Sequence, residues 1–510
     1  MNRAERRRQE RQARQTGEAA GAPAGPQRLQ AIPPAEAMRL AHAYRQRGRN
    51  AEAYALYRRL LLSHPDHPDG LAGCGLAAAG CGLAAFQLGR PEDALRLLRR
   101  AVAARHDFAQ AHNDLAAVLQ ATGRLDEALA ACQRALRFDP KLIEGHVNLG
   151  KVLRQQGDLE QAAAAYGRAV ALAPDHVGAH YRLGITLQAQ DRLDAAAASY
   201  RRALELRPRE AQVHYSLGTV LHSLKRLDEA LAAYERAISL QPALLEGLFE
   251  VGKPRHIHAL FERGEHARAV AALDTFLLRR PGQSCALALK AIALDEVGER
   301  QRARSLVDFE RLIRPRLLRP PPEFGSMDEL NAALAGWIRQ HPTLHEAPAA
   351  FSVHRGLSTG ELLQGDKGPI RAFERMDRGA VEDYQKGLPE DADHPFIANR
   401  PQRWHLTMWA IIIEAEGFQV PHIHPSGWLS GVYYVTLPEA VRTQGERRAG
   451  WIEFGEPYSD IAHSVQPELK SFQPEEGLLL LFPSYFYHRT LPFASERQRI
   501  SISFDVGPTR

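Results

Sequence analysis

The sequence predicts an α+β chain of two unlike parts: an all-α repeat array, then an antiparallel β domain with flanking helices. Three observations support this prediction. Residues of one kind recur every 34 positions through much of the first 300 residues. A proline-rich segment at 314–324, RPRLLRPPPEF, then ends the helical pattern. From about residue 400, short apolar runs separated by Gly and Pro turns are typical of strands.

The length and composition fit a folded chain of several domains. At 510 residues the chain is too long for one ordinary domain. Its 45% hydrophobic and 25% charged residues exclude a disordered, collagenous or disulfide-scaffold protein. No apolar run reaches the ~18–20 residues that cross a bilayer, and the first 14 residues lack the apolar core of a secretory signal. We therefore expect a cytoplasmic protein with no membrane partner.

The positive charge says little about a partner. The net charge is +5 and the isoelectric point about 9.0, but only the first 14 residues form a basic cluster. No aromatic residues are interleaved there for base stacking. We expect residues 1–33 to be a disordered, solvated basic tail, with an RNA or membrane-surface tether as the alternative. We do not expect nucleic acid as a partner of the folded part.

Four cysteines limit the metal chemistry of the second part. They show no C-x-x-C spacing and fit small buried residues of a reducing compartment. They are Cys74, Cys81, Cys132 and Cys285. Because none lies beyond 285, a metal site in the C-terminal part must use histidines and carboxylates.

The repeat array is identified by several positions that keep one period. Alanines recur at Ala94, Ala128, Ala162, Ala196 and Ala230. Aromatic residues recur at Tyr166, Tyr200 and Tyr234, and prolines at Pro140, Pro174, Pro208 and Pro242. Small residues allow two antiparallel helices to touch, large ones fill the groove between neighbours, and proline ends the second helix. The pattern resembles the tetratricopeptide (TPR) repeat, which implies a solenoid of about eight units over residues 34–314.

The resemblance also implies a groove that binds a protein or peptide partner. Two irregularities interrupt the period. A seven-residue duplication, GCGLAAA then GCGLAAF, lies at 73–86, where the first helix of its unit is either extended or frayed. A five-residue insertion around 252–256 breaks the stacking of the units.

The second part begins after a proline-rich linker at 315–325. A capping box at Ser326 and Glu329 opens an amphipathic helix, and residues 326–400 are mostly helical in pattern. Strands are expected at 404–413, 429–437, 451–454, 477–482 and 499–506. Short strands without helices between them indicate an antiparallel barrel or sandwich, with the helices packed outside it.

Three of the nine histidines in this part lie where a metal ion would need them. His422 and His424 are two residues apart at the entry to a strand, so both rings can point to one side. His488 follows an apolar strand 66 residues later, and a barrel can bring it opposite the pair. Imidazole suits Fe(II), and equally Zn, Ni or Cu. Arg499 and Ser501 share one face of the last strand and could hold a dicarboxylate.

These residues resemble a known enzyme family. The segments PHIHPSGWLSGVYYV at 421–435, GLLLLFPSYFYHRTLPF at 477–493 and RISISFDV at 499–506 are similar to the bacterial 2-oxoglutarate/Fe(II) oxygenases that often follow TPR arrays. The resemblance covers residues 326–510 and implies a double-stranded β-helix, that is, a cupin-like jelly roll. It implies Fe(II) bound by His422, His424 and His488, O2 as a substrate, and the C5 carboxylate of 2-oxoglutarate on Arg499 with help from Ser501.

One feature departs from the wider superfamily, in which a carboxylate usually stands where this chain has His424. An inward-facing Tyr434 could also bond to the cosubstrate or simply fill the core.

Three hypotheses about function follow. The first is a 2-oxoglutarate-dependent hydroxylase whose repeats recruit a protein or peptide substrate. The second is a three-histidine cupin-type dioxygenase that does not use 2-oxoglutarate. The third is a TPR scaffold with a catalytically silent barrel.

Overall fold

The computed structural model describes residues 33–63, 85–250, 252, 254–347, 352–442, 448–495 and 497–509. Of the expected basic tail at 1–33, only the last residue belongs to the described part. Of the duplication at 73–86, only the last two residues belong to it. None of the described helices combines the length and the apolar character needed to span a membrane. The chain divides into two compact units, Met1–Pro208 and Arg209–Arg510, and each is taken by itself below.

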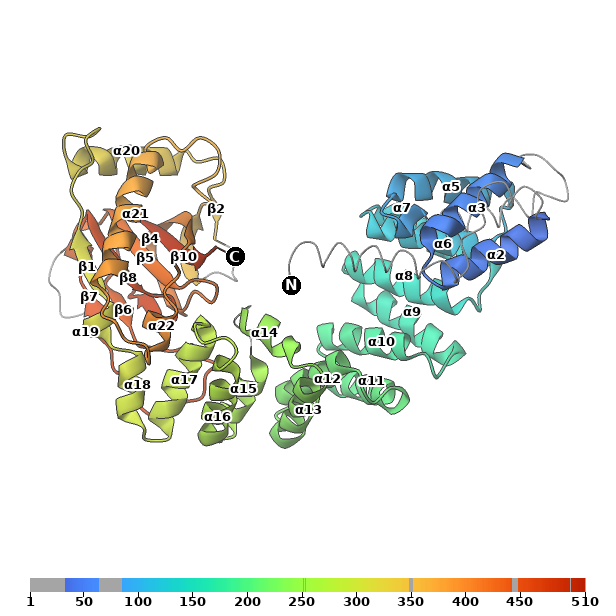
Figure 1. Cartoon of the computed structure of the whole chain (residues 1–510), viewed down its shortest axis with the longest axis horizontal. Helices are drawn as coiled ribbons and strands as arrows, with labels where there is room; N and C mark the ends of the chain where they lie inside the picture. The colour runs from blue at the N-terminus through green and yellow to red at the C-terminus, as the bar shows by residue number, and fades with distance from the viewer. Residues whose placement is uncertain are drawn as a thin grey trace, which may run out of the picture. The chain divides into compact units, whose positions relative to one another are not determined.

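The first unit consists of helical hairpins (Figure 1). Its described helices are α2 (Pro34–Gln46), α3 (Asn50–Ser63), α5 (Pro91–Ala104), α6 (Ala109–Ala121), α7 (Leu125–Phe138), α8 (Ile143–Gln155), α9 (Leu159–Leu172), α10 (Val177–Ala189) and α11 (Leu193–Leu206). From α6 on, first helices of 13 residues alternate with second helices of 14. The regular lengths agree with the 34-residue period of the sequence.

A left-handed turn residue joins the two helices of each repeat. Eight such residues have positive φ: Gly48, Gly89, Gly123, Gly157, Asp191, Lys225, Gly264 and Gly298. Glycine adopts this conformation without the steric cost that a Cβ brings, so six of the eight positions are glycine. The regular spacing of these glycines therefore arises because each turn needs a residue with positive φ.

The recurring tyrosines explain a second set of glycines. Tyr166 and Tyr200 are fully buried on second helices, and each ring lies against a glycine of the preceding first helix. A Cβ at Gly150 would lie 2.8 Å from the Tyr166 ring, and one at Gly184 only 2.5 Å from the Tyr200 ring. Because real Cβ atoms do not come so close, a side chain at either position would force the tyrosine ring to move from its buried place.

The second unit begins with further helices of the same kind. These are α12 (Ala211–Ser223), α13 (Leu227–Leu240), α14 (Ala243–Glu250), α15 (Arg255–Glu262), α16 (His266–Leu277), α17 (Ser284–Glu296), α18 (Arg300–Leu306) and α19 (Phe309–Leu312). Where a first helix of 13 residues is expected, α14 and α15 have eight residues each. The insertion around 252–256 thus divides one helix into two short ones.

An antiparallel sheet follows these helices. Its strands are β1 (Arg314–Leu317), β2 (His345–Glu346), β3 (Val353–Ser358), β4 (Trp404–His422), β5 (Leu429–Thr436), β6 (Ile452–Phe454), β7 (Lys470–Phe472), β8 (Leu478–Pro483), β9 (His488–Thr490) and β10 (Arg499–Pro508). Their order is β1-β8-β5-β10-β4-β9-β6-β7, with β3 also paired to β4 and β2 to β3. This half-barrel of antiparallel strands after a helical array confirms the expected fold class.

The expected linker at 315–325 is partly a strand. β1 pairs with β8, so that Pro315 stands opposite Leu480 at the edge of the sheet. Proline fits an edge strand because the N–H that it lacks is not needed there for a second ladder. The sequence predicts that the repeats end at 314, that the linker ends at 325 and that the second domain begins at 326. These boundaries stay a prediction, because the two compact units instead meet at residues 208 and 209, inside the repeat array.

Helices cover one face of the sheet (Figure 1). The remaining helices are α20 (Met327–Arg339), α21 (Ile370–Gly387), α22 (Pro395–Ala398) and α23 (Glu439–Arg442). Tyr433 of β5 points towards α20 and α21: its hydroxyl donates to Asn331 Oδ1 at 2.6 Å, and its ring lies 4.7 Å from that of Phe373. Successive strand residues face opposite ways, so Tyr434 faces the interior of the half-barrel.

Asp377 is expected to destabilise the fold at neutral pH. This carboxyl lies on α21, is fully buried, and has no hydrogen-bond partner for either oxygen in the described residues. Burial raises its pKa well above the ordinary value. The unfolded chain therefore loses this proton at a lower pH than the folded protein, and stability falls as pH rises from about 4 towards the folded-state pKa.

Asp377→Asn should remove this loss. We expect the melting temperature of the variant to exceed that of the wild type by a margin that grows between pH 4 and pH 7. At pH 7 the gain should be about 1–3 kcal/mol. The control is Asp383→Asn on the same helix, where the carboxylate is exposed and pairs with Arg316 at 2.7 Å. A margin for Asp377→Asn that does not change with pH, measured by calorimetry, would contradict the prediction.

Candidate metal centre

The structure brings the three predicted histidines together. His422 ends β4, His488 begins β9, and the two are paired residues of the antiparallel ladder. His424 follows β4 by two residues. One ring nitrogen from each lies within 4.8 Å of the others. The ring centroids of His422 and His488 are 4.1 Å apart, and that of His424 lies 5.4 Å from the first and 5.1 Å from the second.

Backbone carbonyls orient two of the rings. His422 Nδ1 lies 2.9 Å from the Val420 carbonyl oxygen, and His488 Nδ1 lies 3.0 Å from that of Phe486. Because a carbonyl only accepts, both Nδ1 atoms carry the proton and each Nε2 keeps a free lone pair. Burial lowers the pKa of His422 to about 3 and that of His488 well below its ordinary value. Both rings are therefore neutral at ordinary pH, which is the form that binds metals.

A carboxylate lies behind His424. Asp505 Oδ1 lies 2.6 Å from His424 Nδ1, so this ring too is oriented with Nε2 free. The same oxygen accepts a hydrogen bond of 2.6 Å from the Ser430 hydroxyl. The indole of Trp409 stacks against the ring of His424 with centroids 5.6 Å apart. Position 424 holds a neutral histidine where related proteins usually have a carboxylate. The carboxylate of Asp505, hydrogen-bonded to His424 Nδ1, therefore places a negative charge directly behind this ring.

Removing the charge of Asp505 should weaken metal binding. Asp505→Asn keeps an acceptor near His424 Nδ1 but removes the charge that makes the imidazole a better ligand. We expect Fe(II) affinity, measured by anaerobic titration, to fall about 10- to 100-fold. Ser430→Ala, which removes one hydrogen bond to the same carboxylate, should have a smaller effect. Equal affinities for Asp505→Asn and the wild type would show that Asp505 does not support the ligand.

Arg499 is a buried cation without an anion. Its side chain begins β10 and is only 1% exposed. Among the described residues, neither Nε nor Nη1 has a hydrogen-bond partner, and the hydroxyl of Tyr434 has none either. The guanidinium carbon lies 5.1 Å from the centre of the Tyr434 ring. Burial lowers the pKa of Arg499 and raises that of Tyr434 to about 12, so both keep their protons.

Arg499 and the histidines line one cavity of about 460 Å³. Ser501 lies two residues along the same strand, is 2% exposed and does not line the cavity. Tyr434 pairs with Ser501 across the ladder and also lies behind the wall. The cavity therefore has three imidazole nitrogens and an unpaired guanidinium as its most reactive groups. His488 is buried, whereas His422 and His424 keep partial access to solvent.

The last helices of the repeat array support the loops around this cavity. The hydroxyl of Ser284, at the start of α17, donates to the carbonyl of Gly427 at 2.7 Å, three residues after His424. Glu296, at the end of α17, accepts from Ser464 N and Val465 N at 2.5 and 2.7 Å. Burial alone would raise the pKa of Glu296, but these hydrogen bonds outweigh it and hold the pKa below its ordinary value.

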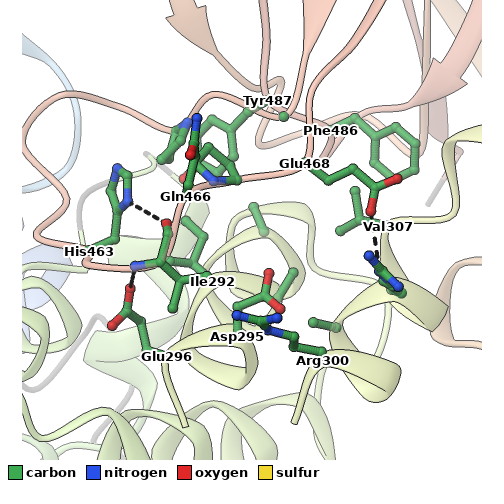
Figure 2. Close-up of a pocket in the computed structure, with 18 of the residues that line it drawn as sticks. Ile292, Asp295, Glu296, Arg300, Val307, His463, Gln466, Glu468, Phe486 and Tyr487 are labelled. Atoms are coloured by element: carbon green, nitrogen blue, oxygen red, sulfur yellow. Dashed lines mark hydrogen bonds and ion pairs between the residues drawn. The ribbon is translucent and has the colours of Figure 1, made fainter. Parts of the chain in front are cut away.

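A second cavity of about 430 Å³ lies between α17, α18 and the loop 455–468. Figure 2 shows Ile292, Asp295 and Glu296 on the helical side and His463, Gln466 and Glu468 on the loop side. Tyr458 of the same loop lines the histidine cavity. The loop thus separates the two cavities.

Sequence reasoning missed several of these residues. Asp505 shares a face with Arg499 in the alternating strand RISISFDV, so strand periodicity carried a signal for it. Ser284 and Glu296 carried none, because they belong to the helical repeats and meet their partners only through the tertiary fold.

Family models match both the repeats and the region of the sheet. The model of the family described as "Putative 2OG-Fe(II) oxygenase" matches residues 407–505. Models of tetratricopeptide repeats match residues 38–70, 82–143, 150–191 and 181–244. No curated protein matches the chain.

Solved structures are similar to parts of this chain. MamA is 19% identical, with 32% of this chain and 96% of that chain covered and a TM-score of 0.31. YrrB, described as a TPR protein with an unusual peptide-binding site, is 20% identical, with 36% and 92% covered and a TM-score of 0.32. PilF of Pseudomonas aeruginosa is 19% identical, with 41% and 92% covered and a TM-score of 0.37.

Proposed function

We propose that this chain, which joins TPR repeats to a domain matching the 2OG-Fe(II) oxygenase family, is an Fe(II)- and 2-oxoglutarate-dependent dioxygenase that hydroxylates a partner recruited by its repeats. One observation carries the proposal: three convergent imidazole nitrogens and an unpaired, buried guanidinium line the same cavity. Neither feature alone would indicate both a metal and a dicarboxylate.

The histidines fit a divalent metal of intermediate softness. Nε2 of His422, His424 and His488 would be the ligands, since each Nδ1 is engaged by a carbonyl or carboxylate. Three neutral ligands leave the charge of the ion uncompensated, and Asp505 offsets part of it through His424. His422 and His424 are partly exposed, so a metal held by the three histidines would be reachable by a cosubstrate.

Arg499 fits the far carboxylate of 2-oxoglutarate. Its planar N–H groups match two carboxylate oxygens, and in a buried site such a pair is strong. Tyr434 and Ser501, which pair across the ladder behind the cavity wall, would support Arg499 from that side. Bound Fe(II) and 2-oxoglutarate would supply the O2-dependent hydroxylation of a C–H bond, with succinate and CO2 as co-products.

The chain's own groups bind, orient and shield. Arg499 holds one end of the cosubstrate so that the other end reaches the histidines. The apolar cavity wall, which includes Ile411, Val432 and Phe482, keeps water from the reacting groups. The repeats raise the local concentration of a protein or peptide partner.

We further propose that the protein works in a reducing, cytoplasmic compartment, which is supported by the buried free thiols of Cys132 and Cys285.

The full-length protein, loaded with Fe(II) without oxygen, tests the proposal. Adding 2-oxoglutarate and then O2 should produce succinate slowly even without a partner substrate. A silent scaffold predicts neither metal binding nor succinate. A three-histidine dioxygenase that does not use 2-oxoglutarate predicts bound iron but no succinate. Either of these outcomes would overturn the proposal, and they are distinguished by measuring iron and succinate together.

A further inference from the structure

A cavity lies beside the insertion around residues 252–256 in the second unit. Where the 34-residue period predicts one continuous first helix, α14 and α15 are separate, and a cavity of about 430 Å³ lies between α13, α15 and α16. Sites for small molecules usually have volumes of about 300–1,000 Å³. This cavity shares no lining residue with the histidine cavity or with the cavity of Figure 2. The function proposed above leaves it without a role.

Most of the cavity wall is apolar. Its apolar side chains come from α13, α15, α16 and the residues directly after α13: Leu231, Ile238, Pro242, Leu260, Ala272 and Phe276. Leu231, Leu260 and Phe276 are each less than a tenth exposed, so the fold holds them in place. Such a wall favours a hydrocarbon chain, because binding removes the apolar surface of the ligand from water.

Two nitrogen-bearing side chains lie at one end of this wall. Because α15 and α16 are antiparallel and joined at Gly264, the start of α15 lies beside the end of α16. The rings of His256 and Phe276 both lie against that of Phe249, at centroid distances of 6.1 and 4.1 Å. Arg279 follows Phe276 by three residues and, like His256, lines the cavity. The imidazole and the guanidinium therefore belong to the same end of the cavity.

His256 is a buried histidine with an unpaired nitrogen. It belongs to the insertion itself and is only 6% exposed. Its Nδ1 has no hydrogen-bond partner in the described part of the chain. Burial lowers its pKa to about 3, so the ring is neutral, with one nitrogen that donates and one that accepts. An unpaired buried polar group is costly, and a polar group of a ligand would remove that cost.

Arg279 is a cation without an ion pair among the residues that the structure describes. The acidic side chains of the wall are already engaged. Glu246 pairs with Arg280 at 2.5 Å, and Glu235 pairs with Arg268 at the start of α16. An anionic group of a ligand would therefore find Arg279 available. A carboxylate fits this end of the cavity, because a guanidinium and an imidazole N–H both donate to it.

We propose that this cavity binds a monocarboxylate with an unbranched hydrocarbon tail, of the fatty-acid class. The carboxylate lies between His256 and Arg279, and the tail follows the apolar wall towards Leu231 and Leu260. The inference goes beyond the proposed function, because binding of this ligand needs neither iron nor 2-oxoglutarate. One ligand then accounts for the apolar wall, the unpaired imidazole nitrogen and the guanidinium without an ion pair.

Titration calorimetry of the full-length protein tests this site. The probe is sodium decanoate, below the concentration at which it forms micelles and without Fe(II). We expect saturable binding at one site. Octanoate should bind about three-fold more weakly or worse, because each buried methylene contributes about a four-fold gain in affinity. Decyltrimethylammonium, with the same tail and the opposite charge, should bind about ten-fold more weakly or worse. Addition of 2-oxoglutarate, which has no apolar tail, should leave decanoate binding unchanged.

Matched variants locate the binding. Arg279→Gln should weaken decanoate binding about ten-fold, and Ala272→Phe, which fills the cavity from α16, by at least about as much. Arg236→Gln, at an exposed position of α13 outside the cavity, should change it less than about two-fold. Circular dichroism establishes that the variants are folded. If Ala272→Phe does not fold, the comparison of positions 279 and 236 decides by itself.

Four results would each overturn the proposal. The first is the absence of saturable decanoate binding, and the second is equal binding of decanoate and decyltrimethylammonium. The third is an equal effect of Arg279→Gln and Arg236→Gln, or full binding in a folded Ala272→Phe variant. The fourth is displacement of decanoate by 2-oxoglutarate, which would place the carboxylate at Arg499 instead. None of these measurements depends on succinate formation, so this proposal can fail while the proposed function stands.

Discussion

Arg499→Ala is expected to abolish productive binding of 2-oxoglutarate while leaving the metal in place. The side chain is buried and its Nε and Nη1 find no partner in the described structure, so the cosubstrate would be the anion that satisfies them. Truncating one member of a buried charged pair costs about 2–5 kcal/mol. We therefore expect the affinity for 2-oxoglutarate to fall on the order of 100- to 1,000-fold. Equilibrium binding to the Fe(II)-loaded protein without oxygen measures this change directly.

Two further variants separate the charge from the shape of the site. Arg499→Lys keeps the charge but loses the planar pair of donors, and should recover only a small part of the affinity. Ser501→Ala should cost far less, because that hydroxyl lies behind the cavity wall. Unchanged 2-oxoglutarate affinity in Arg499→Ala, with iron still bound, would favour the three-histidine dioxygenase that does not use this cosubstrate.

The repeat array was readable from sequence because its constraints are local. A left-handed turn needs glycine, and a ring packed on a helix backbone needs glycine too, so Gly157 and Gly150 recur with the period. The insertion around residues 252–256 was visible for the same reason, since it shifts every later position, but its effect, two short helices in place of one, was not predicted. Each of these signals arises within one or two neighbouring repeats.

The sheet was predicted less completely. The expected strand at 404–413 extends to His422, because its second half pairs with β3 and β9 and gains its order from them. β3 and β7 were missed, since VHRGLS and KSF have no apolar run of their own. Short edge segments become strands when a long partner is already in place, and sequence periodicity does not contain that information.

In the candidate site, too, features that depend on local sequence were predicted and features that depend on tertiary contacts were not. Spacing and the family resemblance together selected His422, His424 and His488, and strand alternation placed Arg499 and Ser501 on one face. The alternation also contained Asp505, but its role depends on the loop that turns His424 back over β10. Ser284, 143 residues from its partner Gly427, could not be found without the fold. The three histidines and Arg499, which the structure brings to one cavity, were thus selected from the sequence, whereas the residues that contact and orient them were not.

Loss of either His422 or His488 should remove the metal altogether. Both rings are held by backbone carbonyls and are paired across the ladder, so alanine at either position leaves only two of the three converging nitrogens. We expect Fe(II) affinity to fall at least 100-fold in His422→Ala and His488→Ala, and succinate formation to fall to background. Anaerobic titration with Fe(II), and with Ni(II) as a redox-inert substitute, measures the loss.

The same series decides the role of His424. If its Nε2 is the third ligand, His424→Ala should lose metal as the other two variants do. If it instead faces the substrate, iron should stay bound while turnover falls. The control is His405→Ala, an exposed histidine on the same strand β4, which should change neither quantity. Full metal binding in both His422→Ala and His488→Ala would contradict the assignment, because the remaining pair cannot hold the ion as tightly as three converging imidazoles.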